Sequence, residues 1–96
     1  MDISRAERRT KRRERVIAAV GQSEANAALD LFELVELAWH DCYREITPPE
    51  EVIDDILLLS RGELSRLIAA AHLAVNDWRD TRVAADRWRG SSKSTE

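Results

Sequence analysis

The spacing of apolar residues along the chain predicts α-helices and no β-sheet. No segment alternates apolar and polar residues over the length of a strand, whereas apolar residues recur three and four positions apart in several stretches. Helix-start signals divide the chain into four helical segments, at about residues 4–20, 24–46, 48–59 and 61–88. We therefore expect an all-α protein.

Three of these starts carry a capping box, in which a Ser or Thr side chain and a Glu three residues later bond free backbone amides. The pairs are Ser4 with Glu7, Thr47 with Glu50, and Ser60 with Glu63. Ser23 is a fourth candidate cap, because it follows Gly21, a residue suited to a left-handed helix end. Gly90 is the expected C-terminal stop of the last helix.

The second helical segment is apolar over most of its circumference. Six residues with alternating spacings of four and three form one stripe: Ala28, Phe32, Val35, Trp39, Cys42 and Ile46. Five further apolar residues widen it: Leu29, Leu31, Leu34, Leu37 and Ala38. A helix of this kind is expected at the centre of the fold, with Cys42 as an inert buried thiol.

The last two segments share one heptad register. The register positions are Ile53, Leu57, Ser60, Leu64, Leu67, Ala71, Ala74, Trp78, Thr81, Ala85 and Trp88. Either the chain breaks at residues 60–62, or one bent helix runs from Pro48 to Trp88, and the preserved register favours the bent helix. The expected architecture is a long antiparallel helical hairpin or a small helical bundle, which self-association would complete.

The domain organisation predicted from these signals has three parts. Residues 1–22 form a basic N-terminal helical arm, residues 23–89 form the hairpin or bundle core, and residues 90–96 form a disordered polar tail. With 96 residues the chain has room for one modest core, so a second copy or a helical protein partner is expected to cover further apolar surface.

The formal net charge of −3 conceals a strong asymmetry along the chain. Residues 1–15 carry seven basic and three acidic residues, and residues 16–60 carry one basic and ten acidic residues. Residues 61–96 carry seven basic and five acidic residues. Local potentials of opposite sign steer partners more strongly than the total charge does.

The basic arm contains six arginines: Arg5, Arg8, Arg9, Arg12, Arg13 and Arg15. Guanidinium groups bind phosphates and carboxylates, so this arm has three interpretations. It contacts a nucleic-acid backbone through residues 5–15, it docks onto an acidic surface of this chain or of a second copy, or it is a solvated helix. The acidic middle of the chain offers a further alternative, an inhibitor or mimic that occupies a basic protein groove.

The sequence offers no constellation for catalysis or for a cofactor. His40, Cys42 and His72 have neither metal-ligand spacing nor a recognisable nucleophile–base pairing, and the three glycines are isolated. We therefore expect no enzyme activity, no metal, no cofactor and no small-molecule substrate. No apolar run approaches the roughly 20 residues of a membrane span, no signal peptide is recognisable, and the single cysteine fits a reducing, cytoplasmic setting.

The C-terminal helix combines tryptophan and arginine, the residue types that dominate protein-binding hot spots. Trp78, Arg82 and Trp88 are the predicted interface residues, with a cation–π pair between Trp78 and Arg82 as the alternative. The sequence thus favours a non-enzymatic protein–protein interaction or regulatory module that self-associates. A small nucleic-acid-binding factor that uses the arginine arm is the alternative function.

Overall fold

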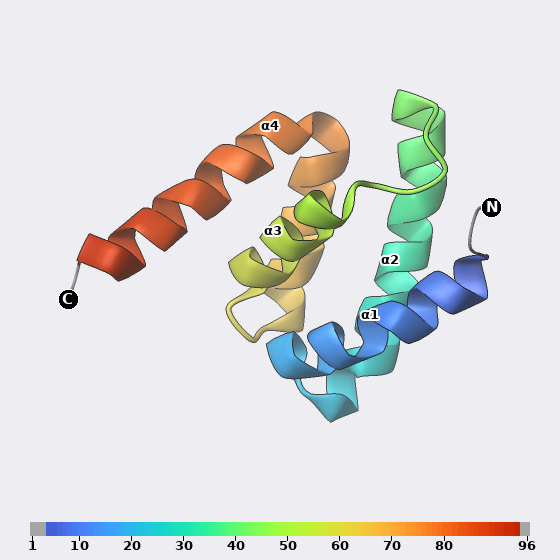
Figure 1. The fold of residues 1–96 in the computed structure, drawn as a ribbon, viewed down its shortest axis with the longest axis horizontal. Coiled ribbons are helices and arrows are strands. Elements are labelled where there is room, and N and C mark those ends of the chain that lie inside the picture. Colours follow the sequence, from blue (N-terminus) through green and yellow to red (C-terminus); the bar gives the residue numbers. More distant parts are fainter. Residues whose placement is uncertain (1–3, 95–96) are drawn as a thin grey trace.

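The fold is known from a computed structural model, which describes the backbone of residues 4–94 and the side chains of residues 4–90. It contains four helices: α1 (Arg5–Val20), α2 (Gln22–Tyr43), α3 (Glu50–Ser60) and α4 (Leu64–Ser94) (Figure 1). No strand occurs within residues 4–94, so the all-α prediction is confirmed.

The core lies between α3, the first part of α4 and the inner side of α2, from Ala25 to Trp39, with α1 closing it from one side (Figure 1). Its largest buried side chains include Phe32 and Trp39 of α2, Ile53 and Ile56 of α3, and Leu67 of α4. Each of the five is at most 1% exposed. Helix α2 packs against α1 and α4, but it is not the central helix that the sequence predicted, because every helix has two such neighbours and Leu34 and Leu37 of α2 are exposed.

Helix α4 is broken at Asp77, whose backbone angles (φ −159°, ψ 97°) are not helical. The amide of Arg79 donates to the Asp77 carboxylate at 3.0 Å, so Asp77 caps a new helix. In an unbroken helix that amide would donate to the carbonyl of Val75. Here the Val75 carbonyl accepts from the hydroxyl of Tyr43 on α2, at 3.0 Å. The side chains of Asp77 and Tyr43 therefore satisfy the Arg79 amide and the Val75 carbonyl, which the break leaves without their helical hydrogen bond.

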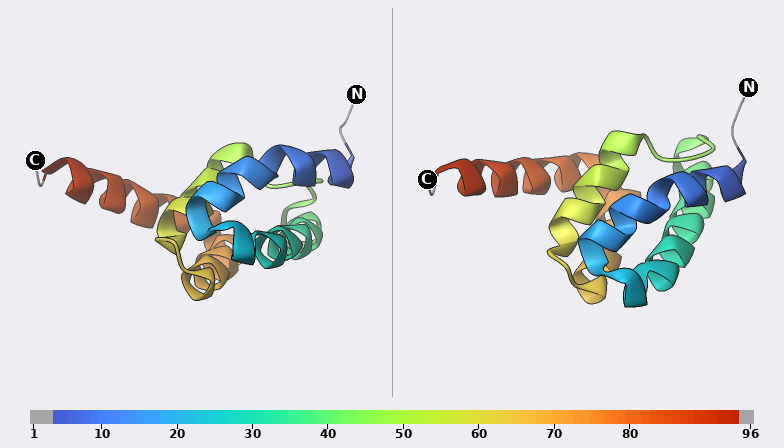
Figure 2. Two further views of the ribbon diagram at one scale, coloured as in Figure 1. Left: turned by 90° about the horizontal axis from the view of Figure 1, so that it is seen from below. Right: turned by 60° about the horizontal axis from the view of Figure 1, so that its bottom comes forward.

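The C-terminal half of α4 (residues 78–94) runs along α3 in the same direction. Arg82 lies 4.0 Å from Glu51 and 3.9 Å from Asp55, near the start and middle of α3, and Trp88 lies against Arg61 just after the end of α3. Beyond these contacts the helix projects from the rest of the molecule (Figure 2). Of the two predicted architectures, the chain forms the small helical bundle, and the C-terminal half of α4 is folded back along α3.

The prediction of one bent helix from Pro48 to Trp88 is wrong. Arg61 and Gly62 both have positive φ, 49° and 82°, and the chain reverses there between α3 and α4. The shared register survives because the apolar sides of both helices face the same core. Positive φ suits Gly62, and the resulting turn makes α3 and the first half of α4 a hairpin.

Of the predicted caps, only that of Ser4 is confirmed, since its hydroxyl accepts from the amide of Glu7 at 3.2 Å. Thr47 caps nothing, because α3 begins at Glu50 with Pro49 before it. Ser60 instead ends α3, and its hydroxyl donates back to the carbonyl of Leu57 at 2.6 Å. Ser23 lies inside α2, which has no side-chain cap; Gly21 (φ 89°) separates α1 from α2 as expected.

Two further predictions require correction. Cys42 is exposed rather than buried, because Tyr43 takes the position that packs toward α4. Gly90 does not stop the last helix, which continues to Ser94 because glycine in a helix interior costs only about 1 kcal/mol relative to alanine. Helix α4 thus includes residues 91–94 of the predicted disordered tail, and residues 95–96 lie outside the described part of the chain.

Candidate interaction surfaces

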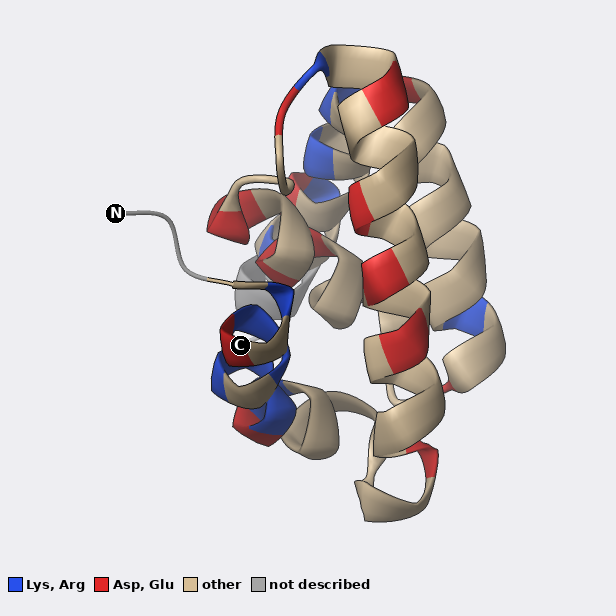
Figure 3. Ribbon diagram, turned by 90° about the vertical axis from the view of Figure 1, so that its right-hand side faces the viewer, with Lys and Arg blue, Asp and Glu red and all other residues tan. Residues whose placement is uncertain are grey.

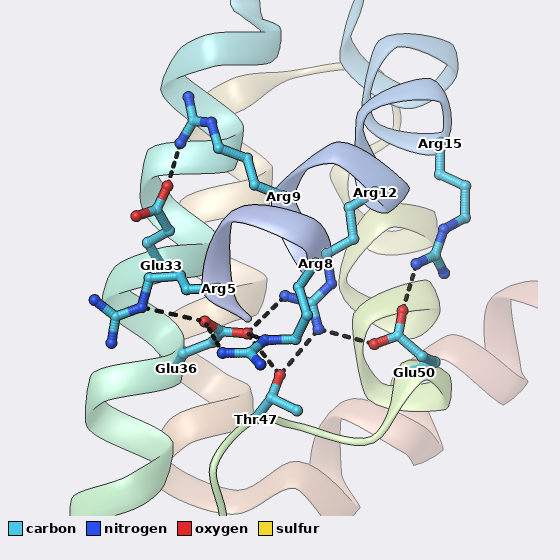
Figure 4. Close-up of polar contacts among 9 residues, drawn as sticks. All are labelled: Arg5, Arg8, Arg9, Arg12, Arg15, Glu33, Glu36, Thr47 and Glu50. Carbon is cyan, nitrogen blue, oxygen red and sulfur yellow. Dashed lines mark hydrogen bonds and ion pairs between the residues drawn. The ribbon is translucent and has the colours of Figure 1, made fainter. Parts of the chain in front are cut away.

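Glu36, on the side of α2 that faces α1, is the centre of an arginine cluster (Figure 4). Its carboxylate is 2% exposed and accepts from Arg8 Nε at 2.5 Å and from Arg12 Nη1 at 3.0 Å. The hydroxyl of Thr47 donates to it at 2.8 Å, and Arg5 Nε lies 3.7 Å away. A buried carboxylate is stable only when such partners replace its water, and Glu36 has them on several sides.

The arginine cluster extends to the N-terminal half of α3. Arg12 donates through Nη2 to Glu50 at 2.8 Å, so its one guanidinium links Glu36 on α2 with Glu50 on α3. Arg15 pairs with Glu50 as well, and with Asp54 one turn further along α3 at 2.6 Å. Three helices are therefore held together by side chains from a single face of α1.

The outer edge of α1 makes more exposed contacts with α2. Arg9 pairs with Asp30 at 2.7 Å and with Glu33. Arg13 donates to the side-chain oxygen of Asn26 at 3.3 Å and has no carboxylate partner within the described residues. These contacts lie at the solvent boundary, where ion pairs contribute little stability.

The two carboxylates at the centre of the cluster have shifted pKa values. Burial disfavours ionisation of Glu36, but hydrogen bonds from Arg8 and Thr47 outweigh it and hold the pKa of this carboxyl below its ordinary value. Arg12 acts in the same direction. The pKa of Glu50 is also lowered, because hydrogen bonds from the two arginines that hold it outweigh the desolvation by burial.

Of the three interpretations of the basic arm, docking onto this chain's own acidic segment is the one observed. Five of the six predicted arginines make ion pairs with α2 or α3: Arg5, Arg8, Arg9, Arg12 and Arg15. The sequence gives the reason, because α1 presents arginines three and four residues apart and α2 and α3 present carboxylates at matching spacings. A nucleic-acid contact through residues 5–15 remains a prediction.

The opposite side of α2 has a different character. Figure 3 shows the red carboxylate residues of α2 with the blue residues of α1 on one side and the mostly tan ribbon of α4 on the other. A groove of about 270 Å³ runs there between α2 and the first half of α4. Its lining residues are Leu31, Leu34, Val35, Ala38, Ile68, Ala71, His72 and Val75.

This surface exposes large apolar side chains, since Leu34 is 63% and Ile68 is 50% exposed. Helical spacing adds Ala27 and Cys42 on α2 and Ser65, Ala69 and Asn76 on α4, all of them exposed. We call the groove and these five residues the uncharged face, because no member is Asp, Glu, Lys or Arg. Contiguous exposed apolar surface of this kind marks a contact site for another molecule.

The predicted interface residues do not all lie together. Trp78, which is 37% exposed, and Arg82 line one pocket of about 230 Å³, together with Trp39 and Val52. Trp88 lies further along the helix, where its half-buried ring faces the guanidinium of Arg61 at 4.0 Å. Trp78 and Arg82 form no cation–π pair.

The contacts of Trp78 and Arg82 explain why these two residues form no cation–π pair. Arg79 is the cation over the Trp78 ring, at 5.5 Å, whereas Arg82 turns toward the carboxylates of α3 and its own helix.

The uncharged face was not identified from the sequence as a site. The sequence nevertheless contains an indication of this face, because Leu31, Leu34 and Ala38 form a second apolar row on α2, outside the stripe of core residues. One neighbouring helix cannot cover both rows, so a helix with two of them needs either a second neighbour or a partner.

Within residues 4–94, no group of three or more His, Cys, Asp and Glu residues has the arrangement of a metal site. Nor does any helix in that part of the chain combine the length and the hydropathy needed to cross a bilayer. No model of a known protein family matches the chain, and no match was found among curated proteins or among solved structures.

Proposed function

We propose that the protein is a non-enzymatic protein–protein interaction module that self-associates, and that the uncharged face of one copy binds the same face of a second copy. The observation that carries this proposal is the exposure of Leu34 and Ile68 on opposite walls of one apolar groove. Solvation of such side chains is unfavourable, and burying apolar area contributes about 25 cal/mol per Å².

A second copy fits this surface for electrostatic reasons. The chain carries a net charge of −3, so two copies repel each other at most orientations. The uncharged face places no like charges opposite each other when a two-fold axis passes through its centre, while Asp30 and Asp41, one and two turns from Leu34 on α2, lie at its edge. Its alanines, Ala27, Ala38 and Ala69, let the helices of the two copies approach closely.

The size of the uncharged face also suits a dimer. Helix α2 has 22 residues, which corresponds to a length of about 33 Å, and packed helices lie about 10 Å apart. Together with the first half of α4 this gives a footprint of about 500 Å², before the relief of the side chains is counted. Standard interfaces bury about 800 Å² per partner, so the face is of the required order.

The arginine cluster supports this assignment over the nucleic-acid alternative. Most of the basic arm is paired with carboxylates of the same chain, and its strongest contacts are buried beside Glu36. A nucleic acid that ran along the arm would have to break the contacts of Arg8 and Arg12 with the buried Glu36, whereas the uncharged face is accessible without any rearrangement. The lone cysteine agrees with a cytoplasmic setting for such a module.

The test is the oligomeric state of the full chain at several concentrations, measured by light scattering or sedimentation. We expect a dimer for the unmodified chain and a monomer for Leu34→Glu and Ile68→Glu, because each places two carboxylates across the dimer axis. Leu37→Glu is the matched control, since Leu37 is also 50% exposed on α2 but lies outside the uncharged face, beside Arg5 and Arg8.

Two results would contradict the proposal. One is an unmodified chain that stays monomeric up to several hundred micromolar, a range that includes interfaces worth about 5 kcal/mol. The other is a dimer that resists both substitutions but dissociates with Leu37→Glu, which would move the interface toward α1. Circular dichroism of each variant confirms that the helices have formed.

A further inference from the structure

A basic cavity lies between α1 and the segment that leads into α3. It has a volume of about 350 Å³ and is lined by Arg8, Lys11, Arg12, Arg15, Ile46, Thr47 and Glu50. It opens on the α1 side of α2, away from the uncharged face, and this volume is in the range of small-ligand sites. We call it the basic pocket.

The lining of the basic pocket is predominantly cationic. Four of its side chains are Lys or Arg, and Glu50 is the one carboxylate among the lining residues. Lys11 is exposed at the rim and has no carboxylate partner within the described residues.

A second observation comes from Arg12, whose side chain is 3% exposed. Its two terminal nitrogens donate to Glu36, Thr47 and Glu50, but its buried Nε donates to nothing within the described residues. Buried donors without an acceptor are rare, because each costs the hydration it has lost. The chain therefore leaves the guanidinium of Arg12, which lines the basic pocket, incompletely satisfied.

Glu50 shows what kind of group fits between the arginines. Its carboxylate accepts from both Arg12 and Arg15, and its side chain is 54% exposed at the start of α3. An anionic oxygen group is therefore already held at this point by a side chain that is free to turn toward solvent. A phosphate has three oxygens and up to two charges, so it makes more charge-assisted hydrogen bonds there than a carboxylate does.

We propose that the basic pocket binds the phosphate group of a small ligand, with Lys11, Arg12 and Arg15 as the phosphate contacts. The phosphate displaces Glu50 and takes its place between Arg12 and Arg15. Ile46, which is 55% exposed, forms an apolar wall beside the phosphate position and suits the organic part of a phosphate ester.

The experiment is calorimetric titration of the full chain with pyrophosphate, inorganic phosphate and a nucleoside 5′-monophosphate, at one fixed ionic strength. We expect saturable binding with one ligand per chain. Lys11→Gln should weaken it about tenfold, the usual effect of losing one charge-assisted hydrogen bond. The melting temperature of this variant should be unchanged, because Lys11 has no partner to lose.

Arg66→Gln is the matched control, because Arg66 lies on α4 and its one carboxylate partner within the described residues is Glu63. It should bind every ligand as the unmodified chain does. Ile46→Ser separates the two sources of phosphate: weaker binding of the nucleotide alone identifies an ester as the ligand class, and unchanged binding of all three identifies free phosphate or pyrophosphate. Either result supports the pocket.

Two outcomes overturn the proposal. One is the absence of saturable heat for all three ligands up to about 10 mM, the upper limit of a useful site. The other is an equal loss of affinity in Arg66→Gln and Lys11→Gln, which would show that the ligands respond to overall charge and not to this pocket.

Discussion

The two sides of α2 reverse the usual relation between polarity and exposure. On the side toward α1, a carboxylate is 2% exposed, at Glu36, while on the side toward α4 a leucine is 63% exposed, at Leu34. Charged side chains are almost never fully buried unless they are paired, and isolated exposed leucines are common but grouped ones are not. Both sides therefore require an explanation beyond the hydrophobic effect.

The difference between the sides lies in where each finds its partner. Glu36 is satisfied within the chain, by arginines from α1 and a hydroxyl from the segment before α3. The described residues leave Leu34 and Ile68 exposed, and we propose that a second copy covers them. Glu36 thus has its partners within the chain, whereas the partner proposed for Leu34 and Ile68 is a second copy.

The largest effect is expected from breaking the charged side. Glu36→Gln removes the anion among three arginines and leaves their charges buried and repelling, which costs about 3–5 kcal/mol. A chain of 96 residues has only about 5–14 kcal/mol of stability, so urea denaturation should show a large shift of the midpoint. Glu33→Gln is the control, because Glu33 pairs with Arg9 near solvent and should lose at most about 1 kcal/mol. Equal losses in both variants would mean that burial does not distinguish the two pairs.

Acid should weaken the same side without any substitution. The folded pKa values of Glu36 and Glu50 lie below the ordinary 4.5, so their contribution to stability is fully present above pH 4.5. It is lost as the pH falls through the lowered folded values. The free energy of unfolding, measured by urea denaturation at a series of pH values, should be flat near neutrality and decline below about pH 4.5. Glu36→Gln should decline less steeply, and a parallel decline would exclude Glu36 as a source.

The smallest effect is expected on the open side, where one substitution is compared at two positions of α2. Leu29→Ala removes a side chain that is 1% exposed and should cost about 2–5 kcal/mol. Leu34→Ala should change the stability of the dilute, monomeric chain by no more than about 0.5 kcal/mol. Thermal or urea unfolding at low protein concentration measures both. A loss above about 1 kcal/mol for Leu34→Ala would place this side chain in the fold rather than in an interface.

The sequence was sufficient to predict the helices because periodic apolar positions are a local signal. The placement of α1 also followed from it, as one of three alternatives, since arginines and carboxylates occur at matching spacings. Cys42 misled the prediction because spacings of four and three drift by about 20° per heptad around a straight helix. Over the length of α2 this drift turns Cys42 out of the core.

The breaks around α4 could not be predicted in the same way. At Gly62 the apolar register continues through the turn, because the helices on both sides face one core. At Asp77 the signal is tertiary, since Tyr43, 32 residues earlier, supplies the hydroxyl for the Val75 carbonyl. The sequence did not identify the uncharged face for a further reason. Whether a row of leucines on a helix is exposed depends on which other helices pack beside it, and the sequence of that helix alone does not determine this.

The break at Asp77 also limits how far helical order extends along α4. An unbroken helix propagates order through its ladder of backbone bonds, but here the ladder ends at Val75 and starts again at Arg79. The C-terminal half is held by the ion pairs of Arg82 and Arg89 with Asp55 and by the contact of Trp88 with Arg61, and its Thr81 and Ala85 are fully buried. The position of this half therefore depends on its contacts with α3 and the turn after it, and not on a continuous helix from Leu64.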